Sequence, residues 1–413
     1  MMTPTEAMRS FLSGSWLEDE LEGSIRQLAG TESASKQGGT SQVEGAPEEQ
    51  PNADINPTEA LNAVAVEGEV LLADMHVAAM GHPFKFDCFL NNMDLNRIPH
   101  LYCYDSTRVV ISQTHGSGDY YHASHVDGYG RKGAYIFAQA PFDDDTERIF
   151  WRLVVDQKPS MILVFGVIDE KQKRKQPYNI ADKGFEKAFL QEFGANSLEE
   201  CDVRAKLSRS FWPEKGGCKD FDKISIVTTD ESSEPHMKTY NLTVKEGKES
   251  ARPAILMHFD EWGAGEDLKD VDQLPEYMLD MRASIKVQTV RSAKKHGAFT
   301  GPILLVCATG VVKCALYATI DIVVSRMTEE HSVGIKETMT AIKTQRFGCF
   351  RTPGPYVTAR QMLMKFAVST GVVHDAAIGD QQKSKTKTVT QKPIPKNNNF
   401  KSARKGVKKV LPG

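Results

Sequence analysis

A short apolar run, a turn of small residues and a longer apolar segment follow one another between residues 301 and 327. Residues 302–306 are apolar and too few for a helix, which predicts a buried strand. Residues 307–313 include Gly310 and predict a tight turn, and residues 314–327 are long enough for a helix. The backbone N–H groups of such a turn and the N-terminus of such a helix attract anions, so the segment predicts an anion-binding cradle.

Cys307 opens this turn, at a position where the N-terminus of the following helix stabilises a thiolate. By itself, however, a buried strand that ends in one cysteine is more often ordinary core than a reactive site. The pattern of apolar and polar positions therefore leaves two interpretations open, a core residue and a nucleophile.

Similar patterns predict a folded domain over residues 57–375. Pro57 suits the first turn of a helix, and folded sequence begins there. Apolar runs and alternation predict strands, and apolar residues at helical spacing predict helices. The predicted strands are 120–126, 134–138, 161–165, 224–227, 239–244 and 255–258, and the predicted helices lie around 150–154, 185–193, 274–285 and 333–342.

The two ends of the chain differ from this domain. Residues 1–28 have the apolar spacing of one amphipathic helix, which packs on its own domain or docks on a partner. Residues 29–56 are rich in Gly, Ser, Glu, Gln and Pro and predict a disordered linker. Residues 376–413 predict a disordered tail, of which 383–413 hold ten Lys or Arg and no acid. Charge alone allows this tail to contact an anionic membrane surface or RNA.

The composition is that of a globular protein, with 40% hydrophobic and 25% charged residues among 413. Seven cysteines without a CxxC pair or zinc-ligand spacing favour reduced thiols in a cytoplasmic protein, with no metal and no cofactor. The first residues lack the basic start and apolar core of a secretory signal. Apolar runs are too short to span a bilayer.

The turn and its flanks resemble the signature loop of the protein-tyrosine phosphatases, His-Cys-x5-Arg-Ser/Thr-Gly after Gly-Pro and an apolar strand. Val306 stands for the His, Cys307 for the nucleophile, Lys313 for the Arg and Cys314 for the Ser or Thr. Val312 stands where the family has glycine, and if that position needs a positive φ, the loop adopts another shape. The resemblance implies that the phosphate is bound by Cys307, Ala308, Thr309, Gly310, Val311, Val312 and Lys313.

A second segment resembles the family's substrate loop. Asn96 and Arg97 match its framework, whereas Ile98 replaces the tyrosine that flanks a phosphotyrosine and His100 replaces the aspartate that holds the peptide. The landmarks of the family continue in order from residue 84 to residue 368. The resemblance therefore implies an α/β (α+β) fold, with a highly twisted central mixed β-sheet flanked by helices.

The segments that complete the family's reaction are altered. The stretch from His258 to Trp262 resembles the mobile acid loop, but Ala264 stands for the general-acid aspartate. The segment that begins with Gln345 and Arg346 resembles the family's late Gln-rich segment and matches it at both residues, but Pro355 stands for the glutamine that positions the attacking water. Proline has no side-chain donor or acceptor for this purpose.

These replacements predict a domain with the family fold that does not turn over substrate. Lys313 keeps the charge of arginine but loses its planar fork, and a positioned general acid contributes ~10²–10⁴ in rate. The first hypothesis is a pseudophosphatase that binds a tyrosine-phosphorylated protein or kinase, or that serves as a signalling scaffold. The alternative is a residual tyrosine phosphatase that uses Cys307, and a third idea is a redox-sensitive thiol at Cys307.

Overall fold

A computed structural model describes the greater part of the predicted domain. The described residues are 68, 70–73, 75, 84–172, 187, 189–191, 195, 201, 204–234, 237–260, 262, 274–296 and 300–370. All of them belong to the unit Met1–Val373. The predictions for residues 1–28, 29–56 and 376–413, and for Ala264, lie outside the described residues, and the predicted domain limits remain predictions.

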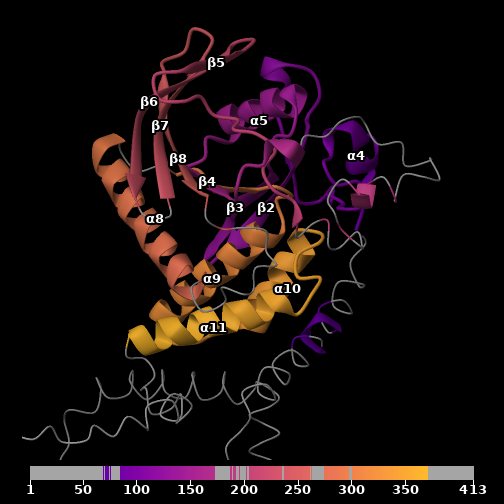
Figure 1. The fold of residues 1–413 in the computed structure, drawn as a ribbon, viewed down its shortest axis with the longest axis vertical. Coiled ribbons are helices and arrows are strands. Elements are labelled where there is room, and N and C mark those ends of the chain that lie inside the picture. The colour runs from indigo at the N-terminus through magenta and orange to yellow at the C-terminus, as the bar shows by residue number, and fades with distance from the viewer. Residues whose placement is uncertain are drawn as a thin grey trace, which may run out of the picture. The chain divides into compact units, whose positions relative to one another are not determined.

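Nine strands form one mixed sheet within the described residues, in the order β1-β2-β3-β9-β4-β8-β7-β6-β5 (Figure 1). The strands β3, β9, β4 and β8 run parallel, and the pairs outside them are antiparallel. Their bounds are β1 Arg108–Val110, β2 Tyr120–Gly128, β3 Arg131–Gln139, β4 Met161–Phe165, β5 Cys218–Phe221, β6 Ile224–Glu234, β7 Met237–Glu246, β8 Arg252–Phe259 and β9 Ile303–Cys307.

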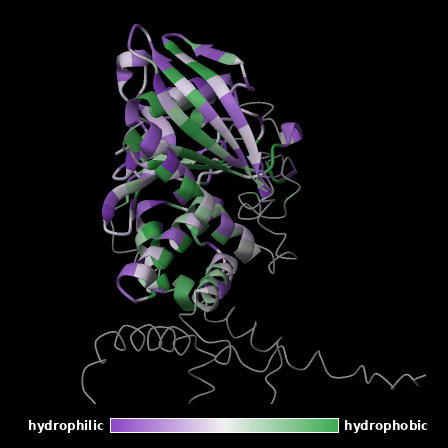
Figure 2. Ribbon diagram, turned by 90° about the vertical axis from the view of Figure 1, so that its left-hand side faces the viewer, coloured by the Kyte–Doolittle hydropathy of each residue, from purple (hydrophilic) through white to green (hydrophobic). Residues whose placement is uncertain are grey.

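The central strands are buried on both faces, whereas an outer strand is not. All five residues of β4 are buried, as expected for a parallel strand covered on both sides. Along β6, buried and more exposed residues alternate in the first half, a pattern typical of an antiparallel strand with one solvated face. Figure 2 shows this alternation of hydrophobic and hydrophilic residues along the outer strands.

Helices cover the two faces of the sheet and divide the core into two clusters. On one face, α5 (Asp144–Gln157) packs with Leu304 and Val306 of β9. On the other face (Figure 1), Leu305 and Cys307 of β9 join a cluster with α8 to α11. Neighbouring residues of β9 enter different clusters because side chains alternate across a strand. The helices of the second face are α8 Leu274–His296, α9 Val312–Glu329, α10 Ile335–Gln345 and α11 Gly354–Ser369.

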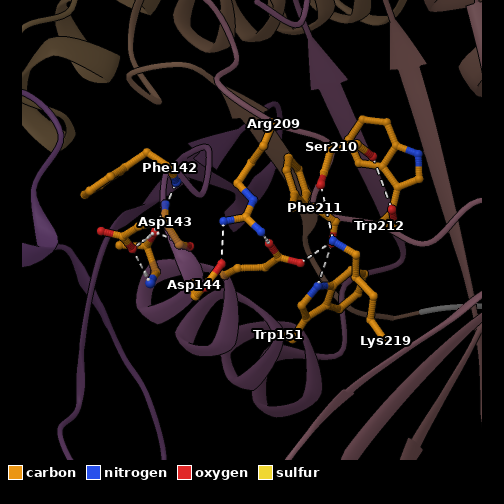
Figure 3. Close-up of polar contacts among 11 residues, drawn as sticks. Phe142, Asp143, Asp144, Trp151, Arg209, Ser210, Phe211, Trp212 and Lys219 are labelled. Carbon is orange, nitrogen blue, oxygen red and sulfur yellow. Dashed lines mark hydrogen bonds and ion pairs between the residues drawn. The ribbon is translucent and has the colours of Figure 1, made fainter. Parts of the chain in front are cut away.

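A buried carboxylate holds α5 to the segment after residue 204. Glu147, whose side chain is 2% exposed, forms ion pairs with Arg209 at 2.9 Å and with Lys219 of β5 at 2.5 Å. Arg209 also donates to Asp144 at 2.7 Å (Figure 3). Nearby, the indole N–H of Trp151 donates to the carbonyl oxygen of Phe211 at 2.9 Å. This network fixes α5 beside the sheet edge that carries β5.

The structure confirms the predicted fold class, a central mixed sheet flanked by helices. The helix expected over 274–285 is longer, because it continues to His296, and the one expected over 314–327 begins at Val312. In the segment predicted as a surface helix over 185–193, residues 187 and 189–191 are helical, and Phe189 is fully buried. None of the helices in the described part of the chain has the length and apolarity needed to cross a bilayer.

Candidate active site

The signature loop starts where β9 ends. Cys307 is the last residue of β9 and pairs with Gln139 of β3 and Phe165 of β4. Its carbonyl oxygen accepts hydrogen bonds from Ala140 at 2.9 Å and from Gly310 at 3.1 Å. Gly310 has φ +67°, and a Cβ there would lie 2.4 Å from the nitrogen of Gln139. Glycine is therefore required at this point, because the chain turns in the left-handed region against a neighbouring strand.

A fully buried arginine holds the loop from behind. Arg346 donates to the carbonyl oxygens of Gly310 at 3.1 Å and Thr309 at 3.3 Å, and to the hydroxyl of Ser124 in β2 at 3.1 Å. The guanidinium group thereby joins the signature loop to β2, which is far away in the chain. The sequence identified Arg346 as a match to the family but gave no sign of this bridging role, because its partners lie far away in the chain and two of them are carbonyl oxygens.

The electrostatic surroundings of Cys307 favour the thiolate. Burial raises the pKa of its thiol, but the hydrogen bond from the Cys314 thiol, the backbone N–H groups of Cys314 and Val311 and the charge of Lys313 outweigh burial. Together they lower the pKa from 9.0 to about 5. At neutral pH, Cys307 is therefore an anion with 3% of its surface exposed.

Lys313 lies at the second position of α9, and its ammonium group is already engaged. Nζ donates to the carbonyl oxygen of Trp262 at 2.7 Å and lies 5.8 Å from the centroid of that indole ring. Burial lowers the pKa of Lys313, the nearby sulfurs of Cys307 and Cys314 raise it, and the result is about 8. Lys313 is thus mostly a cation at neutral pH, with one of its three N–H donors directed at Trp262.

Val312 does not strain the loop, because the condition for strain, a positive φ at this position, is not met. It is the first residue of α9 and is not among the non-glycine residues with positive φ in the described chain. The preceding Val311 is the N-cap and supplies no side-chain hydrogen bond to the helix. The first N–H groups of α9 therefore depend on other acceptors, and the Cys307 thiolate is one of them.

The framework residues of the substrate loop are tied to the signature loop through one glutamine. Gln139 accepts from the backbone of Arg97 at 3.2 Å and donates to the carbonyl oxygen of Leu95 at 2.7 Å. Asn96 is fully buried and accepts from the Tyr120 hydroxyl at 2.6 Å. These bonds fix the segment beside the end of β3. Sequence reasoning matched Gln139 to the family but gave it no role in the site, although it is a polar residue directly after the predicted strand 134–138.

The two replaced residues of this segment have structural surroundings of their own. Ile98 is 1% exposed and belongs to the same core cluster as Cys307, so it does not stand out as a surface platform. His100 is partly buried, and its ring contacts Phe189 edge-on at 5.8 Å. Phe189, which is fully buried, therefore packs against the residue at this position.

Pro355 and Val306 lie at positions that suit their side chains. Pro355 is the second residue of α11, where proline is tolerated because first-turn N–H groups have no intrahelical partner. Val306, which stands for the family's histidine, is fully buried in the other core cluster, on the α5 side of the sheet. Both positions are therefore explained by packing and helix geometry.

Comparison with known proteins assigns the family. The protein-tyrosine phosphatase model matches residues 92–199 and 195–365. The chain belongs to the protein-tyrosine phosphatase family. This membership agrees with the sheet order and with a cysteine-containing loop between a buried strand and a helix.

Individual relatives are distant in sequence. Human tyrosine-protein phosphatase non-receptor type 9 is 24% identical over 296 residues, which are 70% of this chain and 44% of that protein. Tyrosine phosphatase-like protein J1 of Microplitis demolitor bracovirus is 24% identical over 321 residues, 76% of this chain and 95% of J1. This chain thus spans less than half the length of the type 9 phosphatase.

A solved structure supports the same fold. The catalytic domain of human protein tyrosine phosphatase non-receptor type 18 superposes with a TM-score of 0.55 at 16% sequence identity. The superposition covers 75% of this chain and 98% of that domain. At this identity the likeness establishes the fold alone.

Proposed function

We propose that this protein is a cytoplasmic pseudophosphatase, which binds a tyrosine-phosphorylated protein or kinase through the signature loop without turning it over. The observation that carries the proposal is the state of Lys313. A lysine replaces the arginine fork, and its Nζ is held at 2.7 Å by the Trp262 carbonyl oxygen. A single directed ammonium group attracts a phosphate but cannot grip two of its oxygens as a guanidinium does.

Attraction for an anion remains in this site. Lys313 is mostly protonated at neutral pH, and the N-terminus of α9 lies behind it without a side-chain cap. The positive end of a helix favours a phosphate group. The Cys307 thiolate repels a phosphate dianion at close range, which weakens this attraction.

The side chains that would complete a phosphatase reaction are replaced in this sequence. Ala264 supplies no acid for a leaving phenolate, and Pro355 supplies no side-chain group that orients water. A general acid alone contributes ~10²–10⁴ in rate, and the two losses affect different steps. In this proposal the domain therefore binds a phosphotyrosine but does not cleave its phosphate ester or hydrolyse an intermediate.

One observation favours a second function, residual tyrosine-phosphatase activity. The pKa of Cys307 is about 5, so the nucleophile that such a reaction needs is present at neutral pH. Under this alternative, Cys307 attacks phosphotyrosine directly and turnover is slow, because the acid and the water-positioning group are absent. Release of inorganic phosphate from an aryl phosphate, abolished by Cys307→Ser, would establish it.

Calorimetric titration of the full chain with matched phosphorylated and unphosphorylated tyrosine peptides tests the proposal. Binding of the phosphorylated peptide, without release of phosphate, is the expected result. Lys313→Glu weakens this binding by about tenfold or more, since a hydrogen bond to a charged group contributes about 1.5–3 kcal/mol.

Lys132→Glu is the matched control, because it makes the same charge change at an exposed position of β3. Equal loss of affinity in both variants would mean that only net charge matters, which contradicts a site at the loop. If the protein binds neither peptide, the scaffold hypothesis remains, in which the surface of the domain and the charged tail serve as docking sites.

A further inference from the structure

Two thiols meet at the base of the signature loop. Cys314 Sγ donates a hydrogen bond to Cys307 Sγ across 3.5 Å. Cys307 ends β9 and Cys314 is the third residue of α9, so each sulfur is carried by a regular element. Both side chains are buried, Cys307 at 3% and Cys314 at 0% exposure. The pair is therefore held together by the fold and not by a flexible segment.

We infer that Cys307 and Cys314 form an internal disulfide when a hydroperoxide oxidises Cys307. This bond links the two ends of the signature loop and is reversed by a thiol reductant. The inference concerns the two sulfurs and does not depend on the proposed phosphotyrosine binding. A disulfide has an S–S length of about 2.05 Å, so the two sulfurs must approach by roughly 1.5 Å from their present contact. The bond closes a ring over residues 307–314.

The chemistry balances in two steps. The Cys307 thiolate attacks one oxygen of the hydroperoxide, an S–O bond forms, the O–O bond breaks, and the departing alkoxide or hydroxide takes up a proton. Cys307 is then a sulfenic acid. The sulfur of Cys314 attacks the sulfur of Cys307, the S–O bond breaks, and the proton of the Cys314 thiol leaves with the hydroxyl group as water. Two electrons pass from the two sulfurs to the hydroperoxide.

The two thiols differ in a way that suits these roles. Hydrogen bonds and the charge of Lys313 make Cys307 the thiolate of the pair. Burial and the neighbouring Cys307 sulfur raise the pKa of Cys314 well above its ordinary value, so Cys314 remains a thiol. The attacking group toward peroxide is the thiolate, and the second thiol already lies in contact with the sulfur that becomes electrophilic.

Other cysteines are engaged elsewhere. Cys103 contacts Ser124 and the guanidinium of Arg346, and Cys218 contacts Asp220 and Ser225 on the exposed edge strand. Cys201 and Cys349 are both fully buried in the same core cluster as Cys307. Cys349 is the serious competitor, because burial raises the pKa of its thiol and the nearby Cys307 sulfur raises it further. The experiment must therefore distinguish a bond to Cys314 from a bond to Cys349.

Trypsin makes this distinction directly, because it cleaves after Lys313, between the two cysteines. The reduced full-length protein is treated with hydrogen peroxide, its remaining thiols are blocked with N-ethylmaleimide, and the digest is analysed by mass spectrometry. Peptide 296–313 carries Cys307, peptide 314–326 carries Cys314 and peptide 347–351 carries Cys349. The expected product is 296–313 linked to 314–326, with loss of both free peptides and their return after dithiothreitol.

Two variants complete the test. Cys314→Ser removes the linked product and leaves Cys307 to proceed to sulfinic acid, whereas Cys349→Ser leaves the link unchanged. A link between 296–313 and 347–351, irreversible oxidation of Cys307 in the unaltered protein, or an unmodified Cys307 would overturn the inference. Phosphopeptide titration of the oxidised protein is a separate readout, so that failure of the proposed binding does not affect the result for the disulfide.

Discussion

The carbonyl oxygen of Trp262 accepts a hydrogen bond from Lys313, and the sulfur of Cys307 accepts one from Cys314. These two contacts show how single replacements change a site whose backbone is retained. An arginine has donors for Trp262 and for a phosphate at once, whereas lysine offers one ammonium group on a flexible stem. A thiol is a weaker donor than the hydroxyl it replaces, yet it adds a second sulfur. The proposed weak hold on a phosphate and the inferred disulfide both rest on these two contacts.

The reactivity of Cys307 is predicted to follow its lowered pKa. Because the thiolate reacts, alkylation accelerates as pH rises through about 5 and is constant above about pH 6, whereas an ordinary thiol continues to accelerate toward pH 9. Cys314→Ala removes the hydrogen bond that is the largest of the stabilising causes, so the midpoint moves to higher pH. The measurement is the rate of iodoacetamide labelling of peptide 296–313 as a function of pH.

Cys218→Ala is the control for this series, because Cys218 is an exposed thiol on β5 and lies outside the loop. This variant should leave the midpoint of Cys307 labelling unchanged. A midpoint near 9 in the unaltered protein, or the same low midpoint after Cys314→Ala, would show that the neighbouring thiol does not stabilise the thiolate.

At the scale of elements, α5 is fixed by one buried acid with two cationic partners. Glu147 is on the inner side of α5, and its partners Arg209 and Lys219 come from a loop and from β5. Burial raises the pKa of Glu147, although its two cationic partners oppose this effect. The network therefore joins three segments that would otherwise be held only by apolar packing.

Glu147→Ala is predicted to lower the free energy of unfolding by about 1–3 kcal/mol, since it leaves two cations at a partly buried place without their anion. Asp145→Ala on the same helix is the control, because the pair of Asp145 with Arg148 is exposed and should contribute less than about 0.5 kcal/mol. Urea unfolding followed by circular dichroism measures both. Equal losses in the two variants would contradict a structural role for burial of Glu147.

The sequence predicted elements better than it predicted contacts. Apolar runs located β4, β8 and β9, because buried parallel strands are apolar throughout. The condition for strain at Val312, a positive φ, is not met, because this residue begins α9, which the sequence did not reveal. The sequence also did not show the bridging role of Arg346, since its partners are two carbonyl oxygens and the hydroxyl of Ser124, which is distant in the chain.

At the scale of the described domain, a polar layer lies inside the apolar core and joins distant parts of the chain. Arg346, from the segment after α10, reaches Ser124 in β2 and the signature loop. His122, two residues earlier in β2, is fully buried near this guanidinium. The contribution of such buried groups to stability depends on their protonation states, so the free energy of unfolding of the domain depends on pH.

Histidine 122 makes this dependence testable. Burial, together with the positive charge of Arg346, lowers the pKa of His122 well below 6.5. The unfolded chain therefore takes up a proton near pH 6.5, whereas the folded chain does not, and stability is lost as pH falls below that value. Between pH 7.5 and 5.5 the unfolded imidazole changes from mostly neutral to mostly protonated. This change lowers the free energy of unfolding by about 1 kcal/mol, since one pKa unit corresponds to about 1.36 kcal/mol.

His122→Asn removes the titrating group and keeps a polar side chain at this position. The loss of unfolding free energy between pH 7.5 and 5.5, measured by urea titration at both pH values, should shrink by about 1 kcal/mol in this variant. His331→Asn is the matched control, since His331 is exposed and has φ +55°, a conformation that asparagine tolerates. An identical pH dependence in the unaltered protein and in His122→Asn would mean that His122 takes up its proton without unfolding, and that the polar layer admits a second charge beside Arg346.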